Sequence, residues 1–296
     1  MKYKIAICLS GEPRLWKQCK PYYEKFPEVF SDNSGKQDVD IDYFIHSYDE
    51  VTHRSSRIID TETVENVHNN RYITPDFTPI LDFYKPKRHL IETKDALLPY
   101  IQYFFKEDED EYKKIKYSNY SRLSQWMSTS KSIRLCVDFA RETNTKYDFV
   151  IKSRFDVQFF NHPQINIRQI VHKLSIRDWL IIPRIWCKNG RTNIEYGIMW
   201  GSLALMEKAW VEDFPYRLHT LQANVKSFKE WEYRNDIIRK THRATTCHSI
   251  LHYYWAQYKK IQIMCGWPTI TFPYKILRVP TLPEMVNEKG KKTTGL

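Results

Sequence analysis

The sequence predicts an α/β fold in which helices cover both faces of a mostly parallel sheet. Short apolar runs typical of buried strands alternate with segments whose apolar residues recur at helical spacing. This alternation indicates parallel strands joined by helical crossovers. Three predicted strands also end in polar clusters, at residues 10–14, 46–50 and 153–156. Because ligands of such sheets bind at the carboxyl ends of the strands, these clusters are the first candidates for a site.

The N-terminal part is predicted to supply three strands. Residues 3–9 form an apolar run that closes at Ser10 and Gly11, and Pro13 suits the first turn of the next helix. That helix carries its apolar residues at Leu15, Trp16, Cys19, Tyr22, Tyr23 and Phe26. Residues 41–45 are predicted to be the second strand, and residues 87–92 the third, after a proline-rich loop.

A long helix is predicted before the fourth strand. Apolar residues from Leu123 to Ala140 follow three- and four-residue steps, which indicates a helix over residues 121–143. Residues 147–152 are then predicted to be a strand that ends in the 153–156 cluster. Further strands are expected near 179–183, 195–200 and 261–264, and further helices from Ser202 and over 246–260.

Composition narrows the class of protein. The 296 residues can fill one large α/β domain or two small ones. A net charge of +11 favours a polyanionic partner, which includes nucleic acid, an anionic membrane surface or a phosphorylated small molecule. The basic residues are scattered rather than gathered into a block, which disfavours nucleic acid. The cysteines form no Cys-x-x-Cys pair and no apolar run approaches ~20 residues, so we expect neither a structural zinc site nor a transmembrane segment.

Two of the clusters contain residue types that bind phosphate or metal. Ser10 and Gly11 allow backbone amides to approach an anion at a helix start, and Arg14 can contact a phosphate with two hydrogen bonds. An ordinary turn with a surface arginine explains these residues equally well. Asp156 can bind a divalent cation shared with a diphosphate, assisted by Arg154. The alternative is a structural ion pair between the two side chains.

Four segments, in order, resemble glycosyltransferase-like proteins of bacteria and large DNA viruses. They are residues 4–14, the His-Ser-Tyr-Asp end of 39–49, the Ser-Gln pair that opens 124–128, and the Tyr-Asp-x-Val-Ile-x-x-Arg-x-Asp pattern of 147–156. The resemblance implies a GT-A-like, Rossmann-like fold. Because the sequence shows neither a signal peptide nor a transmembrane run, we expect a cytoplasmic protein, in the host cytoplasm if the chain is viral. Residues 1–160 would be the nucleotide-sugar half of the domain, 161–282 its acceptor-side half, and 283–296 a flexible tail.

The resemblance also implies partners and a cofactor. These are a nucleoside-diphosphate sugar donor, a glycan or other hydroxyl acceptor, and a divalent cation, Mn²⁺ or Mg²⁺. Asp156 takes the place of the last carboxylate of the family's Asp-x-Asp motif, whereas Arg154 stands where the first carboxylate is usual. The residues expected to contact the donor are Ser10, Gly11, Arg14, Ser124 and Gln125.

The remaining candidates lie in other segments. Glu195 is the candidate general base, although the family's acidic residue could instead align at Tyr196. His248, four residues before His252 on a predicted helix, could complete a metal shell with Asp156, but helical histidine pairs are frequent. His46 and Asp49 follow the second predicted strand and could contact the base or the ribose of the donor. The last candidates could stack on a sugar or simply pack in the core, and they are Trp200, Trp231 and Trp255.

The sequence therefore predicts a metal-assisted glycosyltransferase. One alternative is a sugar-phosphate nucleotidyltransferase, although its Gly-rich first loop has no counterpart in a chain with 8 glycines. The other alternative is a non-catalytic basic protein that binds polyanions.

Overall fold

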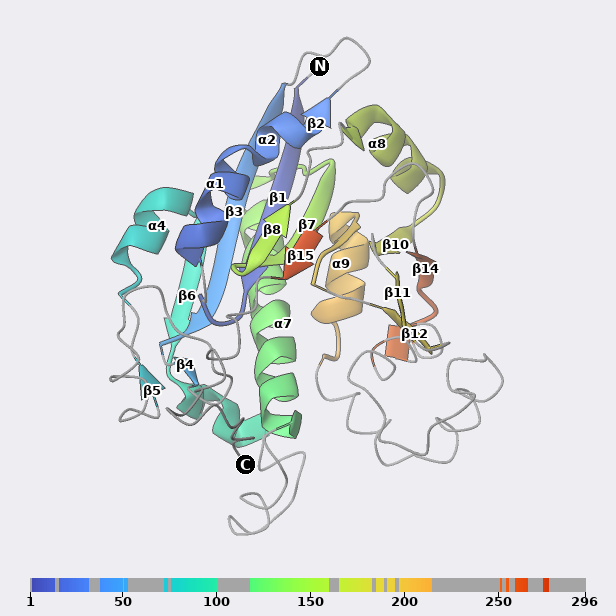
Figure 1. Ribbon diagram of the computed structural model, residues 1–296. Helices are drawn as coiled ribbons and strands as arrows, with labels where there is room; N and C mark the ends of the chain where they lie inside the picture. Colours follow the sequence, from blue (N-terminus) through green and yellow to red (C-terminus); the bar gives the residue numbers. More distant parts are fainter. Residues whose placement is uncertain are drawn as a thin grey trace, which may run out of the picture.

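The computed structural model of the chain contains one seven-stranded sheet with helices on both sides (Figure 1). The residues that the structure describes are 2–13, 16–31, 38–49, 51–52, 72–73, 76–100, 118–159, 165–182, 185–188, 191–194, 197–214, 251, 254–255, 259–265 and 274–276.

The strands of this sheet lie in the order β6-β3-β1-β7-β13-β10-β14. β13 runs antiparallel to both of its neighbours, whereas every other adjacent pair is parallel. This confirms the predicted α/β class with a mostly parallel sheet, and it is consistent with a GT-A-like fold. The bounds of the strands are β1 Tyr3–Ser10, β3 Val39–Tyr48, β6 Arg88–Glu92, β7 Phe149–Arg154, β10 Trp179–Ile182, β13 Met199–Gly201 and β14 Gln262–Cys265.

Helices and short two-stranded ribbons surround the sheet. The helices are α1 (Trp16–Glu24), α2 (Phe26–Val29), α4 (Thr78–Tyr84), the 3₁₀ helix η2 (Lys94–Leu97), α7 (Ser118–Thr143), α8 (Ile167–Ile176) and α9 (Leu203–Trp210). The ribbons pair β2 (Phe30–Ser31) with β9 (Ile165–Asn166), β4 (Val51–Thr52) with β5 (Tyr72–Ile73), β8 (Val157–Phe159) with β15 (Tyr274–Ile276), and β11 (Ile185–Lys188) with β12 (Arg191–Ile194).

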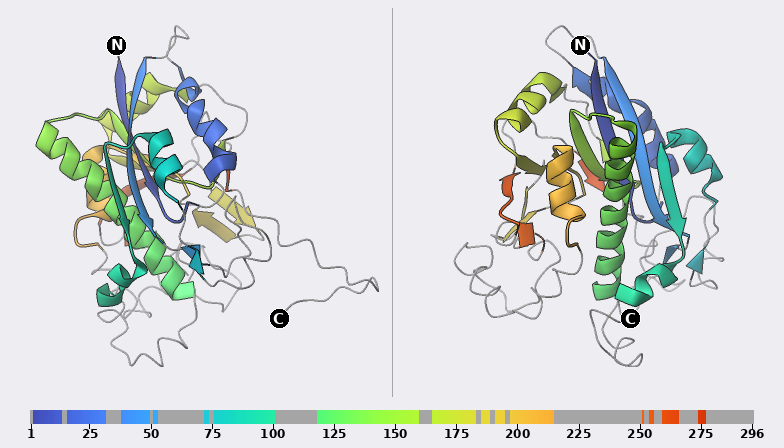
Figure 2. Two further views of the ribbon diagram at one scale, coloured as in Figure 1. Left: turned by 90° about the vertical axis from the view of Figure 1, so that its left-hand side faces the viewer. Right: turned by 180° about the vertical axis from the view of Figure 1, so that it is seen from behind.

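Each face of the sheet has its own apolar core, because successive side chains of a strand point to opposite faces. Ile5, Ile7 and Leu9 of β1 pack with buried residues of α1, α4 and α8. Ala6 and Cys8 pack on the other face, with buried residues of α7 and α9. The views in Figure 2 show α7 and α1 on opposite sides of the sheet. Helices therefore cover both faces, as predicted.

Helix α7 packs on the face of the sheet that carries Ala6 and Cys8, and its buried side chains differ between its two ends. Its C-terminal half buries Ile133, Cys136 and Val137 against the sheet, and it ends before Asn144, whose φ of 51° is typical of a helix C-terminus. Further toward its N-terminus the buried positions include hydroxyl residues, among them Ser128 and Thr129. The apolar part of α7 therefore anchors the helix, and its polar part faces the carboxyl ends of the strands.

Most predicted elements are present, but helix α8 was not predicted, and two further regions differ. α4 lies where the sequence indicated a proline-rich loop, because its Pro79 occupies the first turn, where a missing N–H costs nothing. The strand expected over 195–200 is instead the three-residue β13, and Glu195 and Tyr196 lie outside the described residues. Most of the helix expected over 246–260 and the whole 283–296 tail also lie outside them.

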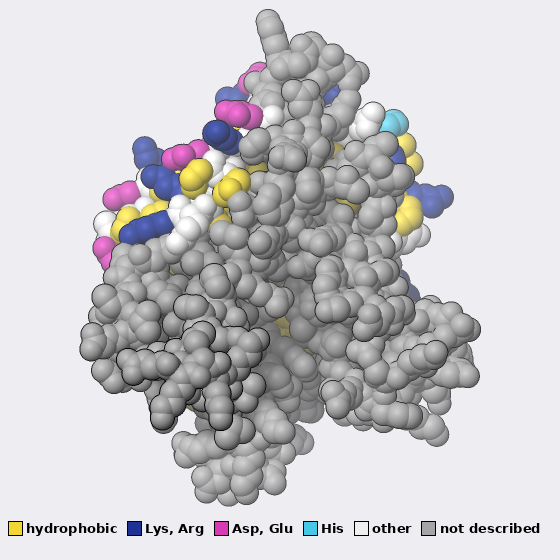
Figure 3. Space-filling model, viewed as in Figure 1, with side chains coloured by type: hydrophobic (Ala, Val, Ile, Leu, Met, Phe, Trp, Pro, Cys, Tyr) yellow, Lys and Arg dark blue, Asp and Glu magenta, His cyan; other side chains and the backbone are white. Residues whose placement is uncertain are grey.

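The predicted halves of the chain contribute to the same sheet. β1, β3, β6 and β7 come from the first half, and β10, β13 and β14 from the second. Lys and Arg side chains on the described part of the surface are interspersed with Asp and Glu side chains (Figure 3). Among the residues that the structure places, no helix combines the length and apolar character needed to cross a bilayer.

Candidate functional site

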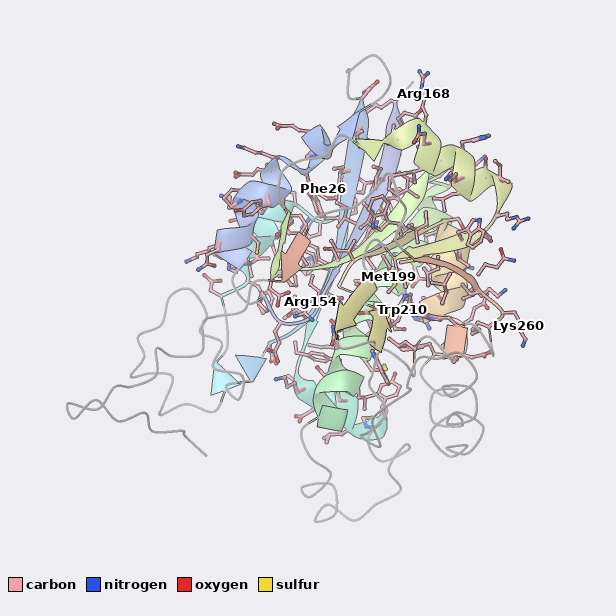
Figure 4. The ribbon with its side chains drawn as sticks, turned by 45° about the vertical axis from the view of Figure 1, so that its right-hand side comes forward. Phe26, Arg154, Arg168, Met199, Trp210 and Lys260 are labelled. Carbon is pink, nitrogen blue, oxygen red and sulfur yellow. The ribbon has the colours of Figure 1, made fainter. Side chains whose placement is uncertain are left out.

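Three polar strand ends meet at the carboxyl edge of the sheet. Ser10 of β1 lies beside His46 of β3 in the strand register, and beside Arg154 of β7 on its other side. These strands are parallel, so all three residues occupy the same edge. Figure 4 shows Arg154 at this end of the sheet, near α7, and Arg168 of α8 at the opposite end of the molecule. The structure thus brings together residues from the three clusters that the sequence singles out.

The turn after β1 is held by hydroxyl groups of α7. The Ser10 hydroxyl is 3.1 Å from the Thr129 hydroxyl and donates to the Ser153 carbonyl at 3.4 Å. Gly11 has a φ of 97°, a backbone conformation that glycine adopts without steric cost, and its N–H donates to Ser128 Oγ at 2.7 Å. This amide therefore serves to fix the turn in this structure. Arg14 lies outside the described residues.

An ion pair between Glu12 and Lys94, with little exposure to solvent, also holds the turn after β1. Glu12 follows Gly11, and its carboxylate accepts a hydrogen bond of 3.3 Å from the ammonium of Lys94, in η2. The side chains of Lys94 and Glu12 are only 7% and 11% exposed, so solvent screens this pair little. The contact joins the turn after β1 to the segment after β6. Sequence spacing gives no sign of it, because the partners are 82 residues apart.

His46 is fully buried and uses both ring nitrogens within the protein. Nδ1 lies 2.8 Å from Ser128 Oγ, and Nε2 lies 3.0 Å from a carboxylate oxygen of Glu92. In the neutral ring Nε2–H donates to Glu92 and Nδ1 accepts, and the single Ser128 hydroxyl hydrogen is shared between Nδ1 and the His46 carbonyl, 3.1 Å from Ser128 Oγ. Glu92 also forms an ion pair with Lys131 of α7. His46 thus links β3 to Ser128 of α7 and to Glu92 of β6, whereas the sequence suggested that it contacts base or ribose.

The surroundings of His46 favour its neutral form. Burial lowers the pKa of the imidazole, and the neighbouring Glu92 carboxylate only partly opposes this effect. For Glu92 itself, burial raises the pKa, but hydrogen bonds from His46 and Lys131 outweigh it, so the pKa ends below its ordinary value. The folded state therefore combines a neutral imidazole with an ionised carboxylate between His46 and Lys131.

This arrangement predicts a loss of stability at acid pH. The unfolded chain protonates His46 near pH 6.5, whereas the folded protein does so only at lower pH. The stability that comes from the neutral ring is therefore present above pH 6.5 and is lost as the pH falls toward the folded pKa. Glu92, whose pKa in the folded protein lies below its ordinary value, stabilises the fold above pH 4.5, and this contribution is lost as the pH falls below 4.5. Urea unfolding between these pH values should show a steeper loss for the wild type than for His46→Gln.

The control for this measurement is His172→Gln, which changes an exposed histidine of α8. It should retain the wild-type slope of stability against pH. Equal slopes for the wild type and His46→Gln would show that His46 does not titrate differently in the folded and unfolded states.

Arg154 and Asp156 form a two-pronged ion pair in the turn after β7. Arg154 Nε donates to Asp156 Oδ1 at 2.7 Å, and Nη2 donates to Oδ2 at 2.6 Å. The Arg154 side chain is 21% exposed, whereas that of Asp156 is 3% exposed. Tyr23 of α1 holds this turn by donating its hydroxyl to the Arg154 carbonyl at 2.6 Å. Asp156 is thus buried and paired with Arg154, which is the ion pair that the sequence offered as the alternative to a metal ligand.

The described residues at this position do not fit a divalent cation. Metal ions bind to oxygen lone pairs, and both carboxylate oxygens of Asp156 accept hydrogen bonds from a cationic guanidinium. No group of three His, Cys, Asp or Glu residues with metal-binding geometry occurs in the part of the chain that the structure describes. His248, the expected second ligand, lies outside that part.

Other predicted residues lie close to the same edge. Ser124 and Gln125 are half-buried on α7, and the Gln125 carbonyl accepts a hydrogen bond of 2.9 Å from Thr129. Asp49 follows β3, and its backbone N–H donates to the Glu92 carbonyl at 2.9 Å. Trp200 and Trp255 are 1% and 0% exposed, so they pack in the core as the alternative interpretation proposed.

The antiparallel direction of β13 brings a further segment to this edge. Met199, the first residue of β13, pairs with Lys152 near the end of β7. The residues that precede β13 therefore lie toward the carboxyl ends of the parallel strands. Gly197 is among them, and its carbonyl accepts a 3.4 Å hydrogen bond from the buried Lys152 ammonium. Glu195 lies outside the described residues, two positions before Gly197 in the sequence.

Several residues of the site were missed at the sequence level. Ser128 and Thr129 bond to the turn after β1, Glu92 bonds to both His46 and Lys131, and Lys94 bonds to Glu12. No signal marks Ser128 and Thr129 in the sequence, because both lie beside the predicted stripe of positions 123, 126, 127, 130, 133, 137 and 140. Their burial follows only from the packing of α7 on the sheet.

The described residues also outline a hollow elsewhere on the molecule. This open depression of about 500 Å³ is lined in part by Arg177, Lys208 and Lys260. It lies at the amino ends of β10 and β14, whereas the polar cluster lies at the carboxyl ends of β1, β3 and β7. The polar cluster remains the candidate site, because ligands in such sheets bind at the carboxyl ends.

Comparisons with known proteins leave the family of this chain open. No protein-family model matches the sequence, and no curated protein matches it. The crystal structure of mouse xyloside xylosyltransferase 1 in its apo form aligns with 89% of this chain and 85% of its own, with 9% identity and a TM-score of 0.36. A likeness of that strength carries no argument about function.

Proposed function

We propose that this protein is a glycosyltransferase that moves a sugar from a nucleoside-diphosphate donor to an acceptor hydroxyl. The observation that carries the proposal is the alignment of Ser10, His46 and Arg154 across three parallel strands at the carboxyl edge of the sheet. Nucleotides bind at this edge in open α/β sheets. The segments that resemble glycosyltransferase-like proteins include these same strand ends, which supports a nucleotide sugar as the ligand.

In the proposed complex the first half of the chain binds the donor. The turn at Ser10 and Gly11 lies next to the nucleotide, and Arg14 contacts a phosphate. Ser124 and Gln125, at the N-terminal part of α7, help to place the donor. Positioning of the two substrates then supplies much of the rate enhancement.

The second half of the chain activates the acceptor. Glu195 takes the proton of the acceptor hydroxyl as the oxygen bonds to the anomeric carbon of the sugar. The bond from that carbon to the diphosphate oxygen breaks, and the nucleoside diphosphate leaves with the bonding electron pair. Gly197 is close to β7 through its bond with Lys152, which supports a place for Glu195 beside the donor.

Ligand-dependent unfolding tests this function. UDP, GDP, ADP and CDP should be compared, each with Mn²⁺ and with EDTA, and heparin should be the polyanion control. At a concentration about 100 times Kd, the correct nucleotide should stabilise the protein by about 2.7 kcal/mol. Stabilisation by heparin with none by any nucleotide would contradict the proposal and support a polyanion-binding protein.

A further inference from the structure

The ion pair at the end of β7 has a form that suits diphosphate recognition. Arg154 lies beside Ser10 at the carboxyl edge, and its side chain retains 21% exposure while Asp156 lies buried behind it. Two hydrogen bonds, of 2.7 and 2.6 Å, fix the plane of the guanidinium. Because a side chain that is fixed in advance loses little conformational entropy on binding, this arginine is prepared for a ligand.

The same pair resembles a metal site in its charge. A divalent cation between two carboxylates carries no net formal charge, and neither does an arginine paired with one aspartate. In both cases a carboxylate behind the cation holds it at the edge of the sheet. Arginine remains protonated at all physiological pH values, and its planar group matches phosphate oxygens with paired hydrogen bonds.

A buried lysine behind Arg154 makes this position differ from a metal site in its ligands. Lys152 lies two residues earlier on β7, which places its side chain on the same face of the sheet. Burial lowers its pKa, and the positive charge of Arg154 lowers it further, while Asp156 acts in the opposite direction. A divalent cation placed here would meet the positive charge of the Arg154 guanidinium, whereas a diphosphate would meet a group of opposite charge.

We infer that the guanidinium of Arg154, held in place by Asp156, meets the diphosphate of the donor, so that donor binding does not require a divalent cation. Arg154 is then the group that contacts the substrate, and Asp156 is a positioning residue. This inference rests on the proposed function and specifies the chemistry of its donor site.

The first experiment uses the wild-type protein alone. Calorimetric titration with the nucleoside diphosphate that stabilises it most should give the same Kd in EDTA and in Mn²⁺. Binding that appears only with Mn²⁺ would overturn this inference and leave the proposed function intact. Absence of binding to all four nucleoside diphosphates under both conditions would overturn the proposed function, and the inference with it.

Variants then assign the effect to Arg154. Arg154→Ala should weaken nucleotide binding in EDTA by ~10-fold or more, the loss expected for a hydrogen-bonded charge contact. Arg154→Lys keeps the charge but loses the planar fork, so it should recover only part of the affinity. The matched control is Arg141→Ala, which removes an arginine that bonds both carboxylate oxygens of Glu207 at 2.7 and 2.8 Å, between α7 and α9.

Asp156→Asn separates positioning from metal binding. If Asp156 orients Arg154, this variant should weaken nucleotide binding in EDTA, and Mn²⁺ should not change the size of the effect. In Arg154→Ala the further change Asp156→Asn should then have little effect on affinity, because the arginine that it orients is gone. A loss in Asp156→Asn that occurs only in the presence of Mn²⁺ would overturn the inference, because it would identify Asp156 as a metal ligand.

Discussion

Trp210→Ala should reduce the free energy of unfolding by about 3–5 kcal/mol, the usual cost of truncating a fully buried tryptophan. Trp210 ends α9 with 0% exposure. Its ring centroid lies 5.2 Å from that of Trp255 and 5.3 Å from that of Phe214, and its Nε1–H donates to the sulfur of Met199 at 3.1 Å. Alanine would leave a cavity between α9 and the sheet and would remove the hydrogen bond to β13.

Urea unfolding measures this effect, with Ile176→Ala as the matched control. Ile176 is a large apolar residue at the end of α8, but it is 62% exposed, so its truncation should change stability by less than about 0.5 kcal/mol. Similar losses in the two variants would show that α9 does not pack on the sheet as the structure describes.

Glu195→Gln should slow sugar transfer by ~100-fold or more while nucleotide binding survives. The amide keeps the shape of the side chain but cannot accept the proton of the acceptor hydroxyl. The donor should still bind, because its proposed contacts come from Ser10, Gly11, Arg14 and Arg154 in the first half of the chain. Transfer rates and nucleotide Kd values should therefore be measured on the same preparation.

Glu207→Gln is the control for this second change. Glu207 is a carboxylate of α9 that pairs with Arg141, on a helix outside the proposed site. Its replacement should leave the transfer rate unchanged. A wild-type rate in Glu195→Gln would show that another residue is the general base. Loss of nucleotide binding would show that Glu195 lies on the donor side.

The main strands could be predicted from the sequence because buried parallel strands are short and apolar. Residues 3–9 and 147–152 show this pattern, and β1 and β7 lie at these positions. The direction of β13 could not be predicted in this way. An antiparallel strand buried inside the sheet needs the same apolar residues as a parallel one, so only its pairing with β7 and β10 reveals its direction.

The site could be predicted in location but not in its contacts. A polar cluster after an apolar strand identified Ser10, His46 and Arg154, because chain order alone places them at one edge. The partner of His46, however, is Ser128, which lies 82 residues further along the chain. Likewise, Arg-x-Asp fits both an ion pair and a metal ligand, and only the turn after β7 shows that Arg154 bonds to Asp156.

The order of the strands has a consequence for how the chain folds. β1 lies between β3 and β7, and its second neighbour is far away in the sequence, since Lys4 bonds to Asp148 across 144 residues. A newly made N-terminal segment can thus pair on only one side until β7 has been synthesised. Because loop closure over such a separation must precede the pairing, the fold has a high contact order and should form slowly. During synthesis, one edge of the largely apolar strand β1 stays open to chaperones or to other chains.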